Sequence, residues 1–158
     1  MADNYSQATL GQYIPADVFT EDELTVFGDC GWDYEGTDTL YFYCELGAYD
    51  FDELDPTDIT EEDIEEHPWL RSEEFKAFYV ENGIISAENA FQIILRRLDE
   101  KQYPYITEEG AYTCSKMRQD EFGGWATFIT RDNMEGFSTS SWLGEKMYKF
   151  KKEKEVQD

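Results

Sequence analysis

The chain has 158 residues and a formal net charge of −23, from 36 acidic and 13 basic side chains. A field this negative repels phosphates, so the composition excludes direct binding to DNA or RNA as the expected function. The 11 Phe, 11 Tyr and 4 Trp exclude a disordered acidic chain, because they supply the apolar surface that such chains lack.

The first half of the chain is predicted to hold two short helices and a hairpin. Residues 1–19 are polar with scattered apolar anchors. The T-E-D-E capping box that follows them predicts a helix over residues 20–29, which ends at glycines. Aromatic and acidic residues then alternate, and a β-rich run follows a turn, which predicts a hairpin over residues 32–46. A second capping box at Thr60 predicts a short acidic helix ending before Pro68.

The second half combines a strongly patterned helix with strands. A helix is expected to start at about Ser72 and to end at Gly83. Residues 86–101 then carry apolar side chains at the i, i+3, i+4, i+7 spacing of a core-facing helix. After Tyr103, β-forming residues divided by glycine-containing turns predict three or four antiparallel strands, the last of them GFSTSSW.

These elements predict an α+β fold. We expect an antiparallel sheet of the C-terminal half to pack on the amphipathic helix over residues 86–101, with the acidic helix and hairpin forming the N-terminal half. Residues 86–143 are then expected to form the stable core. One acidic domain should span residues 1–150, and the lysine-rich tail over residues 146–158 is predicted to fray.

The negative charge is concentrated in the first 70 residues. They contain 20 acidic side chains and no Lys or Arg, and the first basic residue is Arg71. Residues 71–158 hold the other 16 acids and all 13 basic residues, so this half carries only −3 of the formal charge. We therefore divide the domain into a strongly acidic half, residues 1–70, and a core half, residues 71–145.

The densest acidic run, residues 45–66, is the candidate binding surface. Eleven of its 22 side chains are Asp or Glu. Partner binding is predicted for ten acids of this run and for two of the hairpin, and we call these twelve the acidic set: Asp33, Glu35, Asp50, Asp52, Glu53, Asp55, Asp58, Glu61, Glu62, Asp63, Glu65 and Glu66.

Catalytic and metal-binding motifs are weak, and no catalytic residue, metal ligand or cofactor is predicted. His67 is the only histidine, and Cys44 and Cys114 fall in strand-like segments typical of small core residues. Asp50, Asp52 and Glu61 occupy the first, third and twelfth positions of a calcium loop, but the sixth position, which needs Gly, is acidic. Glycoside hydrolysis uses a pair of carboxylates, but the presence of such a pair is no evidence for this activity, because 36 acids always supply one.

The cellular compartment is expected to be the cytoplasm. Three cysteines without CxxC spacing do not form a disulfide framework. The amino terminus lacks the basic and apolar regions of a signal peptide, and no run approaches 18 apolar residues, so no membrane contact is expected.

The charge pattern favours inhibition by imitation of nucleic acid. A folded surface with about twenty unpaired carboxylates approaches the charge density of duplex DNA, which is one negative charge per roughly 1.7 Å. The expected partner is a basic nucleic-acid-binding protein such as a nuclease, a restriction enzyme or a CRISPR effector. In size, charge and class the chain is similar to anti-restriction and anti-CRISPR proteins of phages and plasmids, although no residue motif matches any one family.

Two alternatives stay open. One is an immunity protein that neutralises a basic nuclease toxin, to which the chain is similar in the same general respects. The other is a small soluble acidic domain or an enzyme of unassigned activity, in which a cleft in the β-rich half gathers titratable groups. The position of the carboxylates in the folded chain discriminates between these functions.

Overall fold

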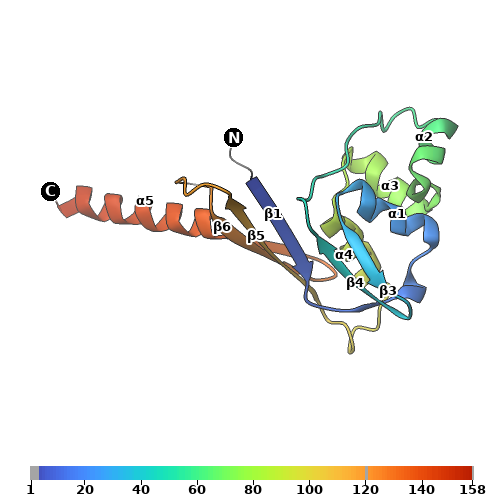
Figure 1. Cartoon of the computed structure of the whole chain (residues 1–158), viewed down its shortest axis with the longest axis horizontal. Coiled ribbons are helices and arrows are strands. Elements are labelled where there is room, and N and C mark those ends of the chain that lie inside the picture. The colour runs from blue at the N-terminus through green and yellow to red at the C-terminus, as the bar shows by residue number, and fades with distance from the viewer. Residues whose placement is uncertain (1–3, 120, 158) are drawn as a thin grey trace.

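One antiparallel sheet runs through the whole molecule, which confirms the α+β prediction (Figure 1). The computed structural model describes residues 4–119 and 121–157. The strand order is β2-β4-β1-β5-β6-β7, and β3 pairs with β4. The strands are β1 (Asn4–Leu10), β2 (Ile14–Pro15), β3 (Asp33–Gly36), β4 (Thr39–Cys44), β5 (Ile106–Cys114), β6 (Gly123–Ile129) and β7 (Met134–Ser138).

Five α-helices and two 3-10 turns complete the described part of the chain. They are η1 (Ala16–Val18), α1 (Glu21–Asp29), α2 (Glu61–Glu66), η2 (Pro68–Arg71), α3 (Glu73–Asn82), α4 (Ala87–Leu95) and α5 (Thr139–Gln157). The capping boxes expected for α1 and α2 are both present, and Gly83 ends α3 in the left-handed conformation. The hairpin predicted over residues 32–46 is the β3–β4 pair.

Strand β1 joins the two halves of the chain into one sheet, and the sequence did not predict it. It pairs with β5 along its whole length, from Asn4 opposite Cys114 to Leu10 opposite Glu108. Its other edge pairs with β4 at Ala8 and Thr9. The small polar residues that fill this strand give a weak alternation, which resembled a loop. The sheet is therefore larger than the C-terminal half alone.

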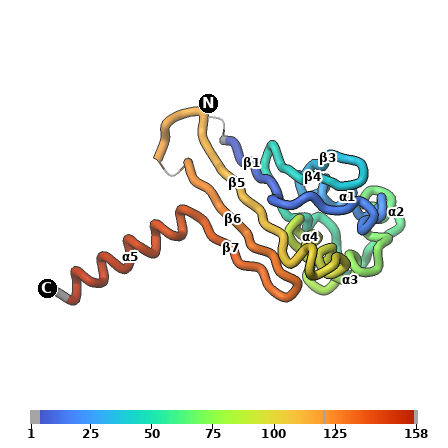
Figure 2. The backbone as a smooth tube through the Cα atoms, turned by 90° about the horizontal axis from the view of Figure 1, so that it is seen from below, coloured from blue at the N-terminus to red at the C-terminus, as the bar shows by residue number. Residues whose placement is uncertain are grey.

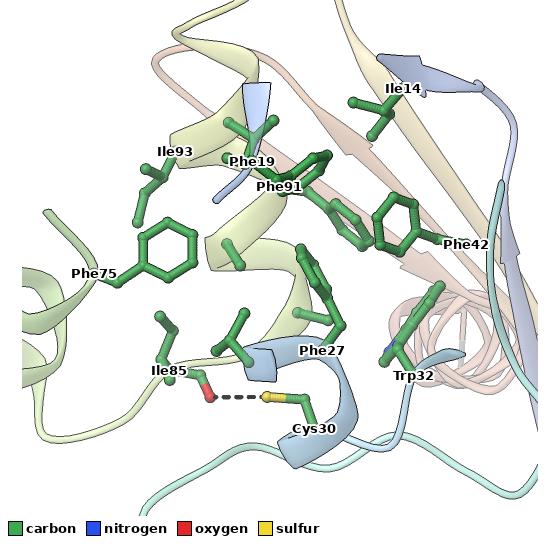
Figure 3. Close-up of a cluster of buried hydrophobic side chains, with 14 of the residues drawn as sticks. Ile14, Phe19, Phe27, Cys30, Trp32, Phe42, Phe75, Ile85, Phe91 and Ile93 are labelled. Atoms are coloured by element: carbon green, nitrogen blue, oxygen red, sulfur yellow. Dashed lines mark hydrogen bonds between the residues drawn. The ribbon is translucent and has the colours of Figure 1, made fainter. Parts of the chain in front are cut away.

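The core lies between the helices and the sheet and takes buried side chains from both halves of the chain, so the prediction that residues 86–143 form the stable core was wrong. Phe27 of α1 packs between Phe42 of β4 and Phe91 of α4, with ring centroids 4.8 and 4.7 Å away (Figure 3). Trp32 lies edge-on to Phe91 at 5.6 Å. The first half of the chain supplies many of these buried rings. By contrast, most side chains of β6 and β7 remain partly or largely exposed.

Two predicted boundaries in the second half also change. Helix α4 ends at Leu95 and does not reach residue 101, because the chain turns at Arg96 and the following arginine reaches back to α1. The predicted strand GFSTSSW stops at Ser138, whose hydroxyl accepts a hydrogen bond from the Ser141 N–H at 3.1 Å and so starts α5. The tail predicted to fray is helical to Gln157, and α5 projects away from the helical body (Figures 1 and 2).

Arg97 connects three helices of the acidic body. Its guanidinium donates to both carboxylate oxygens of Glu23, at 2.9 and 2.7 Å, to Glu74 at 2.7 Å and to the Val18 carbonyl at 2.8 Å. Glu23 is only 2% exposed. Burial alone would raise the pKa of Glu23, but the hydrogen bonds from Arg97, the Thr20 N–H and the Ser72 hydroxyl outweigh it and lower the pKa to about 2.

No helix among the described residues is long and apolar enough to cross a membrane.

Replacing Arg97 with Met should lower the free energy of unfolding by about 3–5 kcal/mol, because a buried carboxylate then loses its counter-ion. The control is Arg71→Met, which breaks the exposed 3.6 Å pair with Asp22 and should cost less than about 1 kcal/mol. Urea unfolding at neutral pH measures both values. Equal losses in the two variants would contradict the role given to Arg97.

The loss of unfolding free energy caused by Arg97→Met should become smaller as the pH falls. In the wild type the Glu23 contribution is complete above its ordinary pKa of 4.5 and is lost as the pH falls toward about 2. In the variant the buried carboxyl has no cation and is stabilised by protonation, so the two unfolding curves converge in acid.

Candidate functional site

The acidic stretch between β4 and α2 is held to the body by apolar anchors. Phe51 is buried, and its N–H donates to the Ile85 carbonyl at 2.8 Å while the Ile85 N–H donates back at 3.1 Å. The Leu54 N–H donates to the Tyr79 hydroxyl at 3.2 Å, and that hydroxyl donates to the Leu54 carbonyl at 3.1 Å. The carboxylates that alternate with these two anchors are exposed. The stretch therefore has a fixed backbone with its charges outward.

Helix α2 presents four carboxylates on a short, capped turn. The Thr60 hydroxyl accepts from the Asp63 N–H at 3.2 Å, and the Thr60 N–H donates to the Asp63 carboxylate at 3.0 Å. Negative side chains in a first turn are stabilised by the helix dipole, which offsets part of their mutual repulsion. Ile59 and Ile64 are partly buried against the core. The exposed side chains are Glu61, Glu62, Glu65 and Glu66.

The structure places eleven members of the acidic set on the surface. Asp63 is the exception, half-buried because it caps α2. Asp55 is exposed and accepts from the N–H and hydroxyl of Thr57, which fixes the turn before α2. Within residues 4–119 and 121–157, no Lys, Arg or His forms an ion pair with any of the twelve.

The two β3 members of the set adjoin the start of the acidic stretch. Asp33 lines a hollow of about 410 Å³ together with Glu45, Leu46 and Tyr49. Glu35 lies further along β3 and accepts a hydrogen bond from the Tyr43 hydroxyl at 3.0 Å. Strand β3 and the acidic stretch thus meet at this hollow, although β4 separates them in the sequence.

The local electrostatics show that the carboxylates crowd one another. Burial, followed by the charges of Glu88 and Asp52, raises the pKa of Asp50 above its ordinary value. The hydrogen bond to Glu35, with the charges of Asp33 and Glu45, raises the pKa of the Tyr43 hydroxyl. Such mutual repulsion costs stability, and a bound cationic surface relieves it.

Other acids of the first half have structural partners, which the sequence could not separate from the free ones. Glu23 is bound by Arg97, as described above. Asp29 accepts from the Trp69 indole N–H at 2.7 Å and lies 2.7 Å from His67 Nδ1. Asp22 faces Arg71. These acids hold α1 against η2 and α4, unlike the members of the acidic set, which form no ion pair among the described residues.

The thiols and the single histidine are placed as structural groups. Cys30, Cys44 and Cys114 are free and buried, and the last two end strands β4 and β5, as their sequence context predicts. Burial raises the pKa of Cys30 to about 12, which keeps its thiol protonated and unreactive. His67 bonds Asp29, and its ring packs edge-on to Phe51. Among the described residues, no three His, Cys, Asp or Glu side chains gather closely enough to hold a metal ion.

A buried carboxyl group lies in the β-rich half, and the sequence did not predict it. Glu108 of β5 is 1% exposed and accepts from the Trp125 indole N–H at 2.8 Å. Burial, together with the neighbouring Glu88 carboxyl of α4, raises the pKa of Glu108 to about 8. Glu108 therefore keeps its proton at neutral pH.

The raised pKa of Glu108 predicts that stability falls as the pH rises. Glu108 titrates near 4.5 in the unfolded chain and near 8 in the fold, so its contribution is complete below about 4.5 and is lost as the pH rises through about 8. Glu108→Gln keeps an acceptor for Trp125 and stays neutral. Its free energy of unfolding relative to the wild type should therefore increase by about 1–3 kcal/mol between acid and alkaline pH. Urea unfolding across this window measures the difference.

The control is Glu109→Gln, which removes an exposed carboxylate from the same strand. Its free energy of unfolding should vary with pH as that of the wild type does, because Glu108 is intact and the loss of one exposed charge changes the repulsion among the surface acids little. Parallel profiles for the wild type and Glu108→Gln would show that Glu108 does not keep its proton in the fold.

Comparison with known proteins adds no relative: no family, curated protein or solved structure matches this chain.

Proposed function

We propose that this protein is a non-catalytic inhibitor that binds the basic nucleic-acid-binding surface of another protein by imitating DNA or RNA. The observation that supports it most directly is the acidic set. Eleven of its twelve carboxylates are exposed, none forms an ion pair among the described residues, and the run over residues 45–66, which carries ten of them, is anchored to the core. A surface that only needed charge for solvation would not require such anchoring.

The charge spacing supports the same proposal. Helix α2 has six residues, so at 1.5 Å per residue it is about 9 Å long. Its four exposed carboxylates give about one charge per 2 Å, close to the one per roughly 1.7 Å of duplex DNA. A groove that evolved to bind phosphates therefore meets a similar charge density. Association should be fast and strongly salt-dependent, because charges steer the encounter.

The partner class follows from the charge. A restriction enzyme, a CRISPR effector or another nuclease carries a basic groove of the required kind, which gives an anti-restriction or anti-CRISPR role. A basic nuclease toxin has the same chemistry, so an immunity protein is the alternative, and the identity of the captured protein separates the two. Free thiols at all three cysteines suit a cytoplasmic location for either role.

The test is capture of the partner with and without the charges of the set. Asp58, Glu61, Glu62 and Glu65 are replaced together with Lys; Asp55 and Asp63 are left intact because they fix the turn and the helix cap. The wild type should retain basic nucleic-acid-binding proteins from a host lysate, and added duplex DNA should displace them. The reversed variant should lose them at low salt, with a smaller difference at high salt, where screening removes the field.

The matched control reverses four exposed acids elsewhere, namely Glu81, Glu100, Glu109 and Asp132. It changes the net charge by the same amount and should keep the captured proteins. Recovery of the same proteins by all three baits would refute mimicry by the acidic set. If the control variant also lost the captured proteins, binding would depend on net charge alone and not on the acidic set.

Direct binding to nucleic acid is not expected. The five lysines of α5 are the one basic cluster of the chain, and the −23 net charge opposes them. A gel shift with long duplex DNA at physiological salt should show no retained complex. Saturable binding at micromolar protein would contradict the electrostatic basis of the proposal.

A further inference from the structure

Helix α5 has no neighbour that explains its stability. Its hydrogen bonds to the sheet come from the first turn, where the Ser140 hydroxyl lies 2.6 Å from the Tyr112 hydroxyl and the Gly124 N–H donates to Thr139 at 3.1 Å. All its side chains described, residues 139–156, are exposed. Most of the stability of helices in proteins comes from the packing of one face against the rest of the fold. The fold therefore presents a 19-residue helix that lacks a surface to pack on.

Three exposed apolar side chains share one side of α5, and further apolar side chains lie elsewhere around the helix. Leu143, Met147 and Phe150 are spaced i, i+4, i+7 and are 52%, 61% and 62% exposed. We call these three residues the α5 stripe. Lys146 and Lys151 flank it, each about 70° from its centre at 100° per residue, and Lys154 follows it on the same side, with its Nζ 5.6 Å from the Phe150 ring centroid. An apolar stripe bordered by lysines fits a surface that is apolar in the middle and acidic at the rim.

Such a surface exists at the other end of the molecule. The hollow of about 410 Å³ beside β3 is lined by Leu46 and Tyr49, which are 93% and 58% exposed, and by the carboxylates of Asp33 and Glu45. Figures 1 and 2 show α5 pointing away from the body that carries β3 and β4. A helix cannot reach this hollow within its own copy, so the matching surfaces must belong to different molecules.

We propose that α5 docks on a second copy of this chain, with the α5 stripe seated on Leu46 and Tyr49 and with Lys146 and Lys151 facing Glu45 and Asp33. A reciprocal exchange of the two helices closes a two-fold dimer, the commonest symmetric assembly. The charges agree, because α5 carries five lysines and three glutamates whereas the first 70 residues have no basic side chain.

The contact is small. The α5 stripe runs from Leu143 to Phe150, about 12 Å at 1.5 Å per residue, so two exchanged contacts about 10 Å wide bury roughly 500 Å², below the ~1,200 Å² at which stable specific interfaces begin. The dimer should therefore be weak and should dissociate on dilution. Asp33 belongs both to this contact and to the acidic set, whereas the four glutamates of α2 stay outside the contact, so different variants test the two proposals.

The experiment is the molar mass in solution by light scattering or sedimentation over a dilution series. The wild type should show twice the 18.5 kDa of one chain at high concentration. Leu143→Asp with Phe150→Asp should give the monomer mass. The matched control is Tyr148→Asp with Val156→Asp, which places the same charges on the same helix outside the stripe and should remain dimeric. All four side chains are exposed, so the body should keep its unfolding transition.

A charge exchange tests the acceptor. Asp33→Lys with Glu45→Lys should give monomers, and so should Lys146→Glu with Lys151→Glu. The chain with all four changes should dimerise again, since each lysine regains an opposite charge. A monomeric wild type, a dimeric stripe variant or an open-ended polymer overturns the proposal. A dimer unaffected by changes at Asp33 and Glu45 overturns it too, and indicates that two α5 helices pair with each other.

Discussion

The fold depends on one guanidinium. The first 70 residues contain no basic side chain, so the negative charge of Glu23 must be balanced by a cation from later in the chain, and that cation is Arg97. It binds Glu23 of α1 and Glu74 of α3 from the end of α4, and it lies 5.9 Å from the centroid of the Phe75 ring. A buried carboxylate at Glu23 is tolerable only with this partner. The three helices that cover the sheet are therefore placed by a contact whose two main partners are 74 residues apart.

Around that contact, aromatic packing offsets the repulsion of the surface acids. The stacked Phe27 and Phe91 rings join α1 to α4, and Phe51, Trp69 and Tyr79 form a second cluster beneath the acidic stretch. Buried rings of this kind contribute both apolar area and favourable ring–ring contacts. The stretch is costly in charge, and it stays ordered because Phe51 and Leu54 bind a rigid core. In this segment, acidic residues supply the negative surface, and the apolar residues between them anchor the backbone to the core.

Local sequence signals predicted correctly those helix ends that depend only on residues near them in the sequence. The capping boxes at Thr20 and Thr60 and the glycine after α3 mark helix ends that form from neighbouring residues alone. Strand β1 was missed because its order depends on β4 and β5, which lie far along the chain. The helical tail was missed because a lysine-rich composition resembles a frayed end. Eleven of the twelve members of the acidic set are exposed, but the sequence could not identify Glu23 and Asp29 as structural or Glu108 as buried.

The two ends of the molecule differ in charge and in packing for a common reason. Lysines are confined to the second half, so the apolar side chains of α5 come with cations, whereas those of the β3–β4 hairpin come with carboxylates. Each end alone exposes apolar groups next to unpaired charges. Exposed apolar groups are unfavourable in water, and both features become favourable against a surface that is apolar and carries the opposite charge. The glutamates of α2 have no comparable apolar neighbour on the helix surface. The glutamates of α2 therefore suit the long-range attraction of a basic groove that the proposed inhibition requires, and the hollow beside β3 suits the short-range packing of the proposed dimer.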